Sequence, residues 1–188
     1  MDYPRIIAVT APSRRSGKGT ITDVLVGEYG YTELMFAMPL KVMYIALLMY
    51  QGVDQAHYPK ILDGYLKETP MEEVGGLSLR TFAEGVGTDW GRDMIDKNLW
   101  VNMAKFKVSK MLDLGHRLVL SDVRFANECD IARQHGGQVW SVTRPVYNGG
   151  KEATLSSEGH LTSYQFDALF FNGGTVDELK DHVRTCMS

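Results

Sequence analysis

The sequence has few cysteines, no long apolar run and no excess of positive charge, and each shortage argues against a class of protein. Its two cysteines, Cys129 and Cys186, have no metal-ligand companions at a suitable spacing, which disfavours a disulfide framework or a zinc site. The longest apolar stretch, at 43–50, is well short of the roughly 20 residues that a membrane-spanning helix requires. A formal net charge of −3 disfavours duplex nucleic acid as a partner, because such binding favours a basic stripe.

The length and the first residues favour one cytoplasmic domain. A chain of 188 residues, of which 44% are hydrophobic, is long enough for one well-packed domain and short for two. Residues 1–5 include an acid and lead straight into a short apolar run, without the basic region, long apolar core and cleavage site of a secretory signal. We therefore expect a single domain, residues 1–188, that works in the cytoplasm without a membrane anchor.

Apolar runs alternate with segments of helical periodicity along most of the chain. Strands are predicted at 6–9, 32–37, 117–121, 138–143 and 168–171, and helices at 19–28, 40–51, 78–86, 99–114, 125–135 and 176–184. The first run lies between Pro4 and Pro12 and is apolar throughout, which is typical of the central strand of a parallel sheet. The pattern predicts an α/β fold with three layers, α/β/α, around a mostly parallel five-stranded sheet that binds ligands at the carboxyl ends of its strands.

Residues 52–76 interrupt this alternation. They mix prolines and glycines with a weak helical patch near 61–66. We interpret them as an insertion into the domain. Two alternatives stay open: a helical, mobile element that covers the substrate and excludes water, or a plain surface excursion.

A phosphate-binding loop is predicted between the first strand and the first helix. Backbone amides at a helix start can cradle a phosphate, and Lys18 can bridge the phosphates that react. Arg14 and Arg15 either neutralise phosphate charge or lie in solvent. The residues predicted to bind ATP in this loop are Ser13, Arg14, Arg15, Ser16, Gly17, Lys18, Gly19 and Thr20.

This loop departs from the usual phosphate-loop pattern at two positions. Pro12 stands where the first glycine is expected, and it lacks an N–H and fixes φ. Gly19 follows Lys18 in place of the Ser or Thr whose hydroxyl usually binds Mg²⁺, and Thr20 comes one place later. We therefore expect Thr20 to contact a phosphate or the metal, with Mg²⁺ held largely through water.

Asp122 follows the apolar run at 118–121, so a strand is expected to carry a carboxylate to the ligand-binding edge of the sheet. There it would hold Mg²⁺-bound water or orient the acceptor phosphate. The alternative is that Asp122 caps the helix beginning near Phe125. Arg124 would stabilise charge on the transferring phosphoryl group, or it would be a solvated helix cation.

Taken together, these residues resemble the deoxynucleoside monophosphate kinases of bacteriophages, which are P-loop nucleoside monophosphate kinases. The similarity extends in blocks over most of the chain, and the most discriminating block is similar to the family's Arg-containing helix, Gly-Thr-Asp turn and Trp-Val helix start. The blocks are Arg15-Ser16-Gly17-Lys18-x-Thr20, Phe36-Ala37-Met38-Pro39-Leu40-Lys41, Ser78-Leu79-Arg80, Gly87-Thr88-Asp89, Asp96 with Trp100-Val101, Asp122-Val123-Arg124 with Glu128, Asp130-x-x-Arg133, Val142-Thr143-Arg144-Pro145, His160-Leu161-Thr162 and Asn172-Gly173-Gly174-Thr175.

The resemblance implies roles for further residues. Arg80 would grip the acceptor monophosphate, and Arg144 becomes a second candidate phosphate ligand. The other implied substrate-binding residues are Lys41, Glu84, Thr88, Asp89, Trp100 and Glu128, with Glu84 standing where the family often has Gln. Asn172 and Gly174 would lie near the adenine. Without the family, Arg80 is a helix cation, Trp100 a core aromatic, and Asn172 with Gly174 a tight turn.

These features predict an enzyme that uses ATP and Mg²⁺ to convert deoxynucleoside monophosphates to diphosphates, with Lys18, Asp122, Arg124 and Arg144 as catalytic residues. Two alternatives remain: a related small-molecule kinase of the phosphomevalonate or dephospho-coenzyme A kinase type, and a nucleotide-binding regulator that is not a kinase. The sequence leaves base preference and oligomeric state open, with a homodimer as one alternative. If the protein is viral, its compartment would be the host cytoplasm.

Overall fold

The computed structural model describes residues 3–13, 15–62, 64–145, 147–148, 151–152, 161 and 164–188. Three residues named above, Arg14, His160 and Thr162, lie outside the described residues. The chain divides into two compact units. We call residues 1–35 with 103–188 the sheet unit, and residues 36–102 the helical unit.

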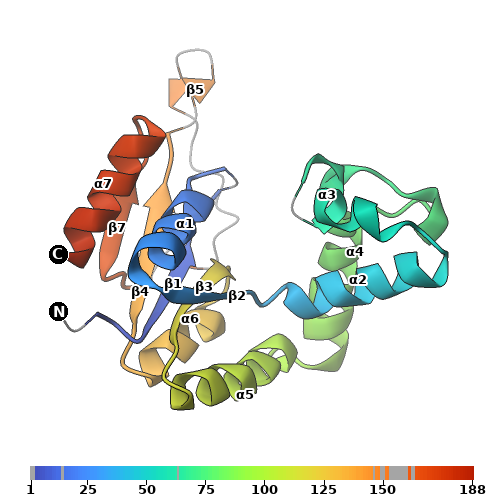
Figure 1. The fold of residues 1–188 in the computed structure, drawn as a ribbon, viewed down its shortest axis with the longest axis horizontal. Helices are drawn as coiled ribbons and strands as arrows, with labels where there is room; N and C mark the ends of the chain where they lie inside the picture. Colours follow the sequence, from blue (N-terminus) through green and yellow to red (C-terminus); the bar gives the residue numbers. More distant parts are fainter. Residues whose placement is uncertain are drawn as a thin grey trace. The chain divides into compact units, whose positions relative to one another are not determined.

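The sheet unit is built on five parallel strands, as the sequence predicts (Figure 1). Their order across the sheet is β2-β3-β1-β4-β7, so the first strand is central. All five residues of that strand are buried, since it has neighbours on both sides and helices on both faces. The strands are β1 (Ile6–Thr10), β2 (Tyr31–Leu34), β3 (Arg117–Val123), β4 (Gln138–Thr143) and β7 (Ala168–Phe171).

Two strand boundaries differ from those expected. The strand predicted at 32–37 ends at Leu34, because the chain leaves its partner β3 there and enters the helical unit at Phe36. The strand predicted at 117–121 continues to Val123, because Val123 still pairs with Thr10 of β1. Asp122 therefore lies inside the strand and not after it.

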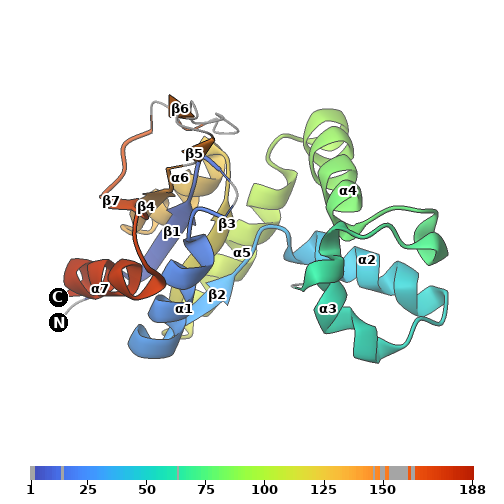
Figure 2. The ribbon, with the colours of Figure 1, turned by 90° about the horizontal axis from the view of Figure 1, so that it is seen from above.

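Helices cover both faces of this sheet, which gives the predicted three layers. Helices α1 (Lys18–Tyr29) and α7 (Val176–Met187) pack against each other on one face, and α6 (Ala126–Gln134) lies on the other (Figure 2). Helix α5 (Leu99–Asp113) begins in the helical unit and ends in the sheet unit. The core under α1 and α7 includes Leu179 and Val183, and each buried side chain of this kind contributes about 1.5–3 kcal/mol.

A few further observations complete the sheet unit. A two-stranded antiparallel pair, β5 (Tyr147–Asn148) with β6 (Lys151–Glu152), follows β4. Both cysteines are free thiols, and burial raises the pKa of Cys129 to about 12. Across the described part of the chain, no helix is long and apolar enough to span a membrane.

The helical unit has a small core of its own. Tyr44, Leu48, Ile61 and Leu79 are buried together, and the Tyr44 hydroxyl donates to the carbonyl of Leu77 at 2.7 Å. Residues 52–76 lie within this unit, and their described part forms short helices. Its elements are α2 (Met38–Tyr50), η1 (Gln55–His57), α3 (Tyr58–Leu62), η2 (Tyr65–Glu68), η3 (Glu72–Val74), α4 (Leu79–Glu84) and η4 (Gly85–Ile95).

The expected turn at Gly87-Thr88-Asp89 is wrong, because η4 is a π-helix that continues directly from α4. The indole N–H of Trp100 donates to the carbonyl of Gly87 at 2.7 Å. In an α-helix, that carbonyl would accept a hydrogen bond from the backbone N–H four residues later. A side chain at Gly91 would come within 2.7 Å of the Trp100 ring. Packing of this ring against glycine backbone therefore accompanies the wide helical turns.

Candidate functional site

Four segments that carry predicted site residues leave the same edge of the sheet. The register pairs Thr10 of β1 with Val123 of β3 and with Ser141 of β4, and it pairs Thr143 with Phe171 of β7. Because these strands are parallel, the segments that follow them emerge together. The phosphate-binding loop follows β1, Arg124 follows β3, Arg144 follows β4 and Asn172 follows β7.

The phosphate-binding loop is held by its own serines. Ser16 is buried, and its Oγ donates to the carbonyl of Ser13 at 2.7 Å and lies 2.8 Å from the Ser13 Oγ. Arg15 and Gly17 both adopt positive φ, at 57° and 114°. A positive φ is unfavourable for a residue with a side chain, so the loop holds Arg15 in a strained backbone conformation.

Helix α1 presents an open N-terminus directly after this loop. Gly17 is its N-cap residue, no side chain caps it, and no acidic residue lies in its first turn. The first N–H groups of a helix have no partners within the helix and carry partial positive charge, which favours a bound anion. Lys18 and Thr20 of this turn are partly exposed, whereas Gly19 is exposed with open space around it.

The carboxylate of Glu128 caps helix α6. It accepts hydrogen bonds from the backbone N–H groups of Arg124 at 2.8 Å and Phe125 at 3.2 Å, and Glu128 is buried. The alternative that Asp122 caps this helix is therefore wrong, since the N-cap residue is Phe125 and Asp122 is the penultimate residue of β3. Glu128, expected among substrate ligands, fixes the backbone of Arg124, whose side chain is exposed.

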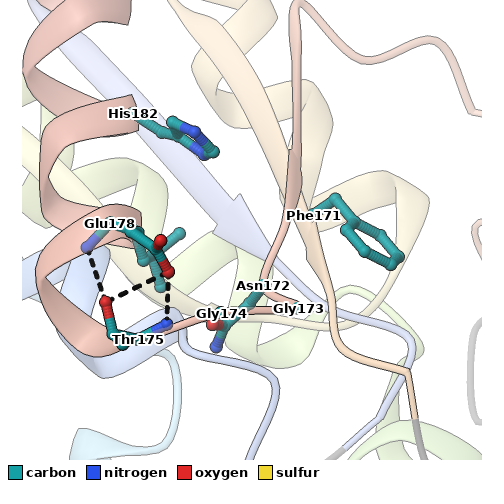
Figure 3. A pocket seen from close by; sticks show the side chains of 8 residues that line it. Phe171, Asn172, Gly173, Gly174, Thr175, Glu178 and His182 are labelled. Atoms are coloured by element: carbon teal, nitrogen blue, oxygen red, sulfur yellow. Dashed lines mark hydrogen bonds between the residues drawn. The ribbon is translucent and has the colours of Figure 1, made fainter.

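A hollow of about 330 Å³ lies beside the segment between β7 and α7 (Figure 3). Thr175 and Glu178 close the first turn of α7, because the Thr175 N–H donates to Glu178 Oε2 at 2.7 Å and the Glu178 N–H donates to Thr175 Oγ1 at 3.2 Å. The hydrogen bond from the Thr175 backbone lowers the pKa of Glu178. The hollow is lined by Phe171, Asn172, Gly173, Gly174, Thr175, Glu178, Leu179 and His182.

Asn172 connects this hollow to the phosphate-binding loop. Its side-chain amide donates to the carbonyl of Ser16 at 2.9 Å, and the residue is buried. The sequence predicted Asn172 and Gly174 as ligands or as a turn, but it gave no sign of Phe171 or His182. A Thr-x-x-Glu capping signature at Thr175 marks the helix start, and it does not reveal a hollow.

In the helical unit, Arg80 is held by two carboxylates. Its Nε donates to Glu68 Oε1 at 2.6 Å and its Nη1 donates to Glu84 Oε1 at 3.0 Å. Burial of the guanidinium acts to lower the pKa of Arg80, but the hydrogen bonds to Glu68 and Glu84 outweigh burial and raise the pKa above its ordinary value. Arg80 therefore stays charged, and Glu84 serves it as a partner.

The remaining predicted acceptor residues are also in the helical unit. Trp100 is buried and bonded to Gly87, as the core-aromatic alternative expects. Lys41 is partly exposed on α2, and Thr88 and Asp89 are exposed on η4. The sheet unit brings together Ser13, Arg15, Ser16, Gly17, Lys18, Gly19, Thr20, Asp122, Arg124, Glu128, Arg144, Asn172 and Gly174, and the helical unit holds Lys41, Arg80, Glu84, Thr88, Asp89 and Trp100.

A parallel sheet whose central strand leads through a glycine-containing loop to an open helix N-terminus that begins at a lysine defines a P-loop protein. Comparison with solved structures supports this fold. The Thermus thermophilus protein TT1252 matches with a TM-score of 0.51 and 16% identity over 98% of this chain and 97% of its own. A dephospho-CoA kinase from Campylobacter jejuni matches with a TM-score of 0.51 and 12% identity over 97% of this chain and 94% of its own.

Sequence comparison then identifies the family. Residues 64–183 match the sequence model of the deoxynucleotide monophosphate kinases. A protein of Acanthamoeba polyphaga mimivirus, whose name places it provisionally among the same kinases, is 30% identical in an alignment 183 residues long, which covers 92% of this chain and 91% of the relative. The chain belongs to the deoxynucleotide monophosphate kinase family. It is a phosphotransferase, so the predicted kinase family and the predicted phosphorylation of deoxynucleoside monophosphates are confirmed, whereas ATP, Mg²⁺ and a bacteriophage source stay predictions.

Proposed function

We propose that this protein transfers the γ-phosphoryl group of ATP to the 5′-phosphate of a deoxynucleoside monophosphate. The observation that carries the proposal is the open N-terminus of α1 behind the Lys18 loop, at the sheet edge where Arg124 and Arg144 also follow their strands. An oxygen of the acceptor phosphate would attack the γ-phosphorus, and the bond to the β–γ bridging oxygen would break, which releases ADP. This chemistry needs positioning and positive charge more than a protein nucleophile.

The sheet unit would bind the donor. The α1 amides and Lys18 would hold the β- and γ-phosphates, and the exposed Arg15 would neutralise part of their charge. The hollow beside Asn172 and Gly174 would take the base, since its volume of about 330 Å³ lies at the lower end of small-molecule pockets, roughly 300–1,000 Å³. Arg124 and Arg144 would stabilise charge on the phosphoryl group as it transfers.

The donor set at this edge also fits Mg²⁺. Among the described residues, no group of three or more His, Cys, Asp and Glu side chains could form a protein metal cage. Mg²⁺ in phosphate-transfer sites uses one or two carboxylates, substrate phosphates and several waters, so the partly exposed Asp122 and Thr20 are a sufficient protein contribution. When bound, the ion would neutralise charge on the donor phosphates.

The helical unit would bind the acceptor. Arg80 keeps its charge, and two of its donors, Nε and Nη1, already point to oxygen acceptors, which a phosphate group would replace. Glu68 belongs to η2, within residues 52–76. If a phosphate replaced Glu68 at Arg80, this segment would lose its ion pair with Arg80. That coupling supports the proposal that residues 52–76 cover the substrate. Lys41, Thr88 and Asp89 would complete the acceptor site.

Several finer proposals accompany this function. We expect the enzyme to work in the cytoplasm, where its nucleotide substrates would be available, and to bind no duplex nucleic acid. A homodimer and a bacteriophage source remain predictions from the sequence.

A coupled assay of ADP release tests the proposed function. The purified protein is supplied with ATP and Mg²⁺, alone and with each of the four common deoxynucleoside monophosphates. We expect at least one monophosphate to stimulate ADP release strongly. Equal, slow release in all five reactions would contradict the proposed function. A sixth reaction with phosphomevalonate or dephospho-coenzyme A would then separate the alternatives, because stimulation there favours the small-molecule kinase and its absence favours the nucleotide-binding regulator.

A further inference from the structure

The side chain of Asn172 bridges two segments that are far apart in the sequence. Its amide Nδ2 donates to the carbonyl oxygen of Ser16 at 2.9 Å, across 156 residues, and only 8% of Asn172 is exposed. Its backbone N–H donates to the carbonyl of Thr143 at 2.8 Å, which extends the pairing of β4 with β7 by one residue. The sheet therefore fixes Asn172, and Asn172 in turn fixes Ser16.

The contact determines the direction of a second backbone group. A trans peptide is planar, with its C=O and N–H on opposite sides, so a Ser16 carbonyl held toward Asn172 turns the Gly17 N–H away from Asn172. Gly17 has a φ of 114°, and a side chain there would come within 2.7 Å of both Asn172 Nδ2 and Leu179 Cδ2. The side chains of Asn172 and Leu179 therefore pack closely against the Cα atom of Gly17.

We propose that Asn172 is a positioning residue, which orients the Ser16–Gly17 peptide for the donor phosphates and does so independently of any contact with the base. The inference rests on the proposed function, because it assumes that a nucleotide donor occupies the Lys18 loop. It differs from the expectation that Asn172 is an adenine ligand. One Nδ2 hydrogen of Asn172 bonds the Ser16 carbonyl, and through this bond the residue acts on the donor by way of the loop.

The test compares Asn172→Ala and Asn172→Asp with Gln138→Ala. Gln138 is a suitable control because its side chain also makes one hydrogen bond, from the Trp140 indole at 2.8 Å, at the opposite end of β4 from the ligand edge. Thermal melting of each variant reports any loss of stability. Steady-state kinetics then give kcat, the KM for ATP, the KM for the monophosphate, and the inhibition constant of inorganic tripolyphosphate, which has no base.

We expect Asn172→Ala to raise the KM for ATP and the tripolyphosphate inhibition constant by the same factor, roughly three- to tenfold, the value of one neutral hydrogen bond. Asn172→Asp should have the larger effect, because a carboxylate also cannot donate and its oxygens would repel the Ser16 carbonyl oxygen. The KM for the monophosphate should not change in either variant, and Gln138→Ala should alter melting alone.

Two results would overturn the inference. One is an unchanged tripolyphosphate constant in both Asn172 variants, whether or not the KM for ATP rises, because the residue would then act on the base or not at all. The other is a wild type that tripolyphosphate does not inhibit. If the wild type showed no monophosphate-stimulated ADP release, the proposed function itself would be contradicted. This result is distinct from the two above, which contradict the role of Asn172 alone.

Discussion

The two units of this protein hold their arginines in different ways. In the helical unit, the Arg80 guanidinium is engaged by Glu68 and Glu84, and 22% of its side chain is exposed. In the sheet unit, within the part of the chain that the structure describes, no carboxylate forms an ion pair with the exposed arginines of the donor edge, which are Arg15, Arg124 and Arg144.

This difference suggests different energetics for the two substrates. A donor phosphate would meet three arginines that need not leave a carboxylate first. The acceptor phosphate would have to displace Glu68, Glu84 or both from Arg80, so part of its binding energy would be used for the exchange. The same exchange would make the acceptor site selective for a dianionic group, because a neutral ligand could not replace two carboxylates.

The largest effect should come from the donor side. We expect Lys18→Ala to lower kcat by at least about 100-fold, because it would remove the charged donor that we propose for the phosphates that react. The melting temperature should stay close to that of the wild type, since Lys18 is only partly buried. Lys107→Ala, an exposed lysine on α5, is the control and should retain full activity. Near-normal turnover in Lys18→Ala would contradict the proposal that Lys18 binds the donor phosphates.

A smaller and more selective effect is expected on the acceptor side. Arg80→Ala should raise the KM for the monophosphate about 10- to 100-fold, as expected for a lost hydrogen bond to a charged group, and leave the KM for ATP unchanged. Arg184 is a matched control, because it is also held by two carboxylates, Glu28 and Asp181, on the surface of the sheet unit. Arg184→Ala should leave both KM values unchanged. An equal rise of both KM values in Arg80→Ala would show that Arg80 maintains the fold and does not select the acceptor.

The smallest effect should have the opposite sign. Glu68→Gln removes one of the two negative charges that would compete with the acceptor for Arg80, so the KM for the monophosphate should fall, by about two- to fivefold given the modest strength of partly exposed ion pairs. Glu72→Gln changes an exposed carboxylate in the same segment and should have no effect. A higher KM in Glu68→Gln would mean that Glu68 orients Arg80 for binding and does not compete with the ligand.

Most of the sheet unit could be predicted from local sequence. Strands β4 and β7 have their predicted bounds, because each is rich in β-favouring residues and pairs along its whole length. The position of the Lys18 loop followed from its place between the central strand and a helix. The Glu128 cap and the Asn172 bridge could not be predicted, because each depends on which side chain reaches a backbone group once the segments have folded together.

The helical unit was harder to predict because its structure depends on contacts between side chains and glycine backbone. The π-helix at Gly85–Ile95 accompanies the packing of Trp100 against Gly91 and its bond to Gly87, which periodicity does not report. The sequence marked 52–76 as an insertion, whereas the compact unit spans 36–102 because α2 and α4 supply much of its core. The resemblance that suggested Arg80 as a phosphate ligand did not indicate its two carboxylate partners.

The most direct test of the account follows the transferred phosphate itself. The wild type is incubated with Mg²⁺, ATP labelled with ³²P at the γ-position and the deoxynucleoside monophosphate that best stimulates ADP release, and the products are separated by chromatography. We expect the label to appear in the deoxynucleoside diphosphate, in an amount equal to the ADP formed. Label found only in inorganic phosphate, or retained in ATP, would contradict it.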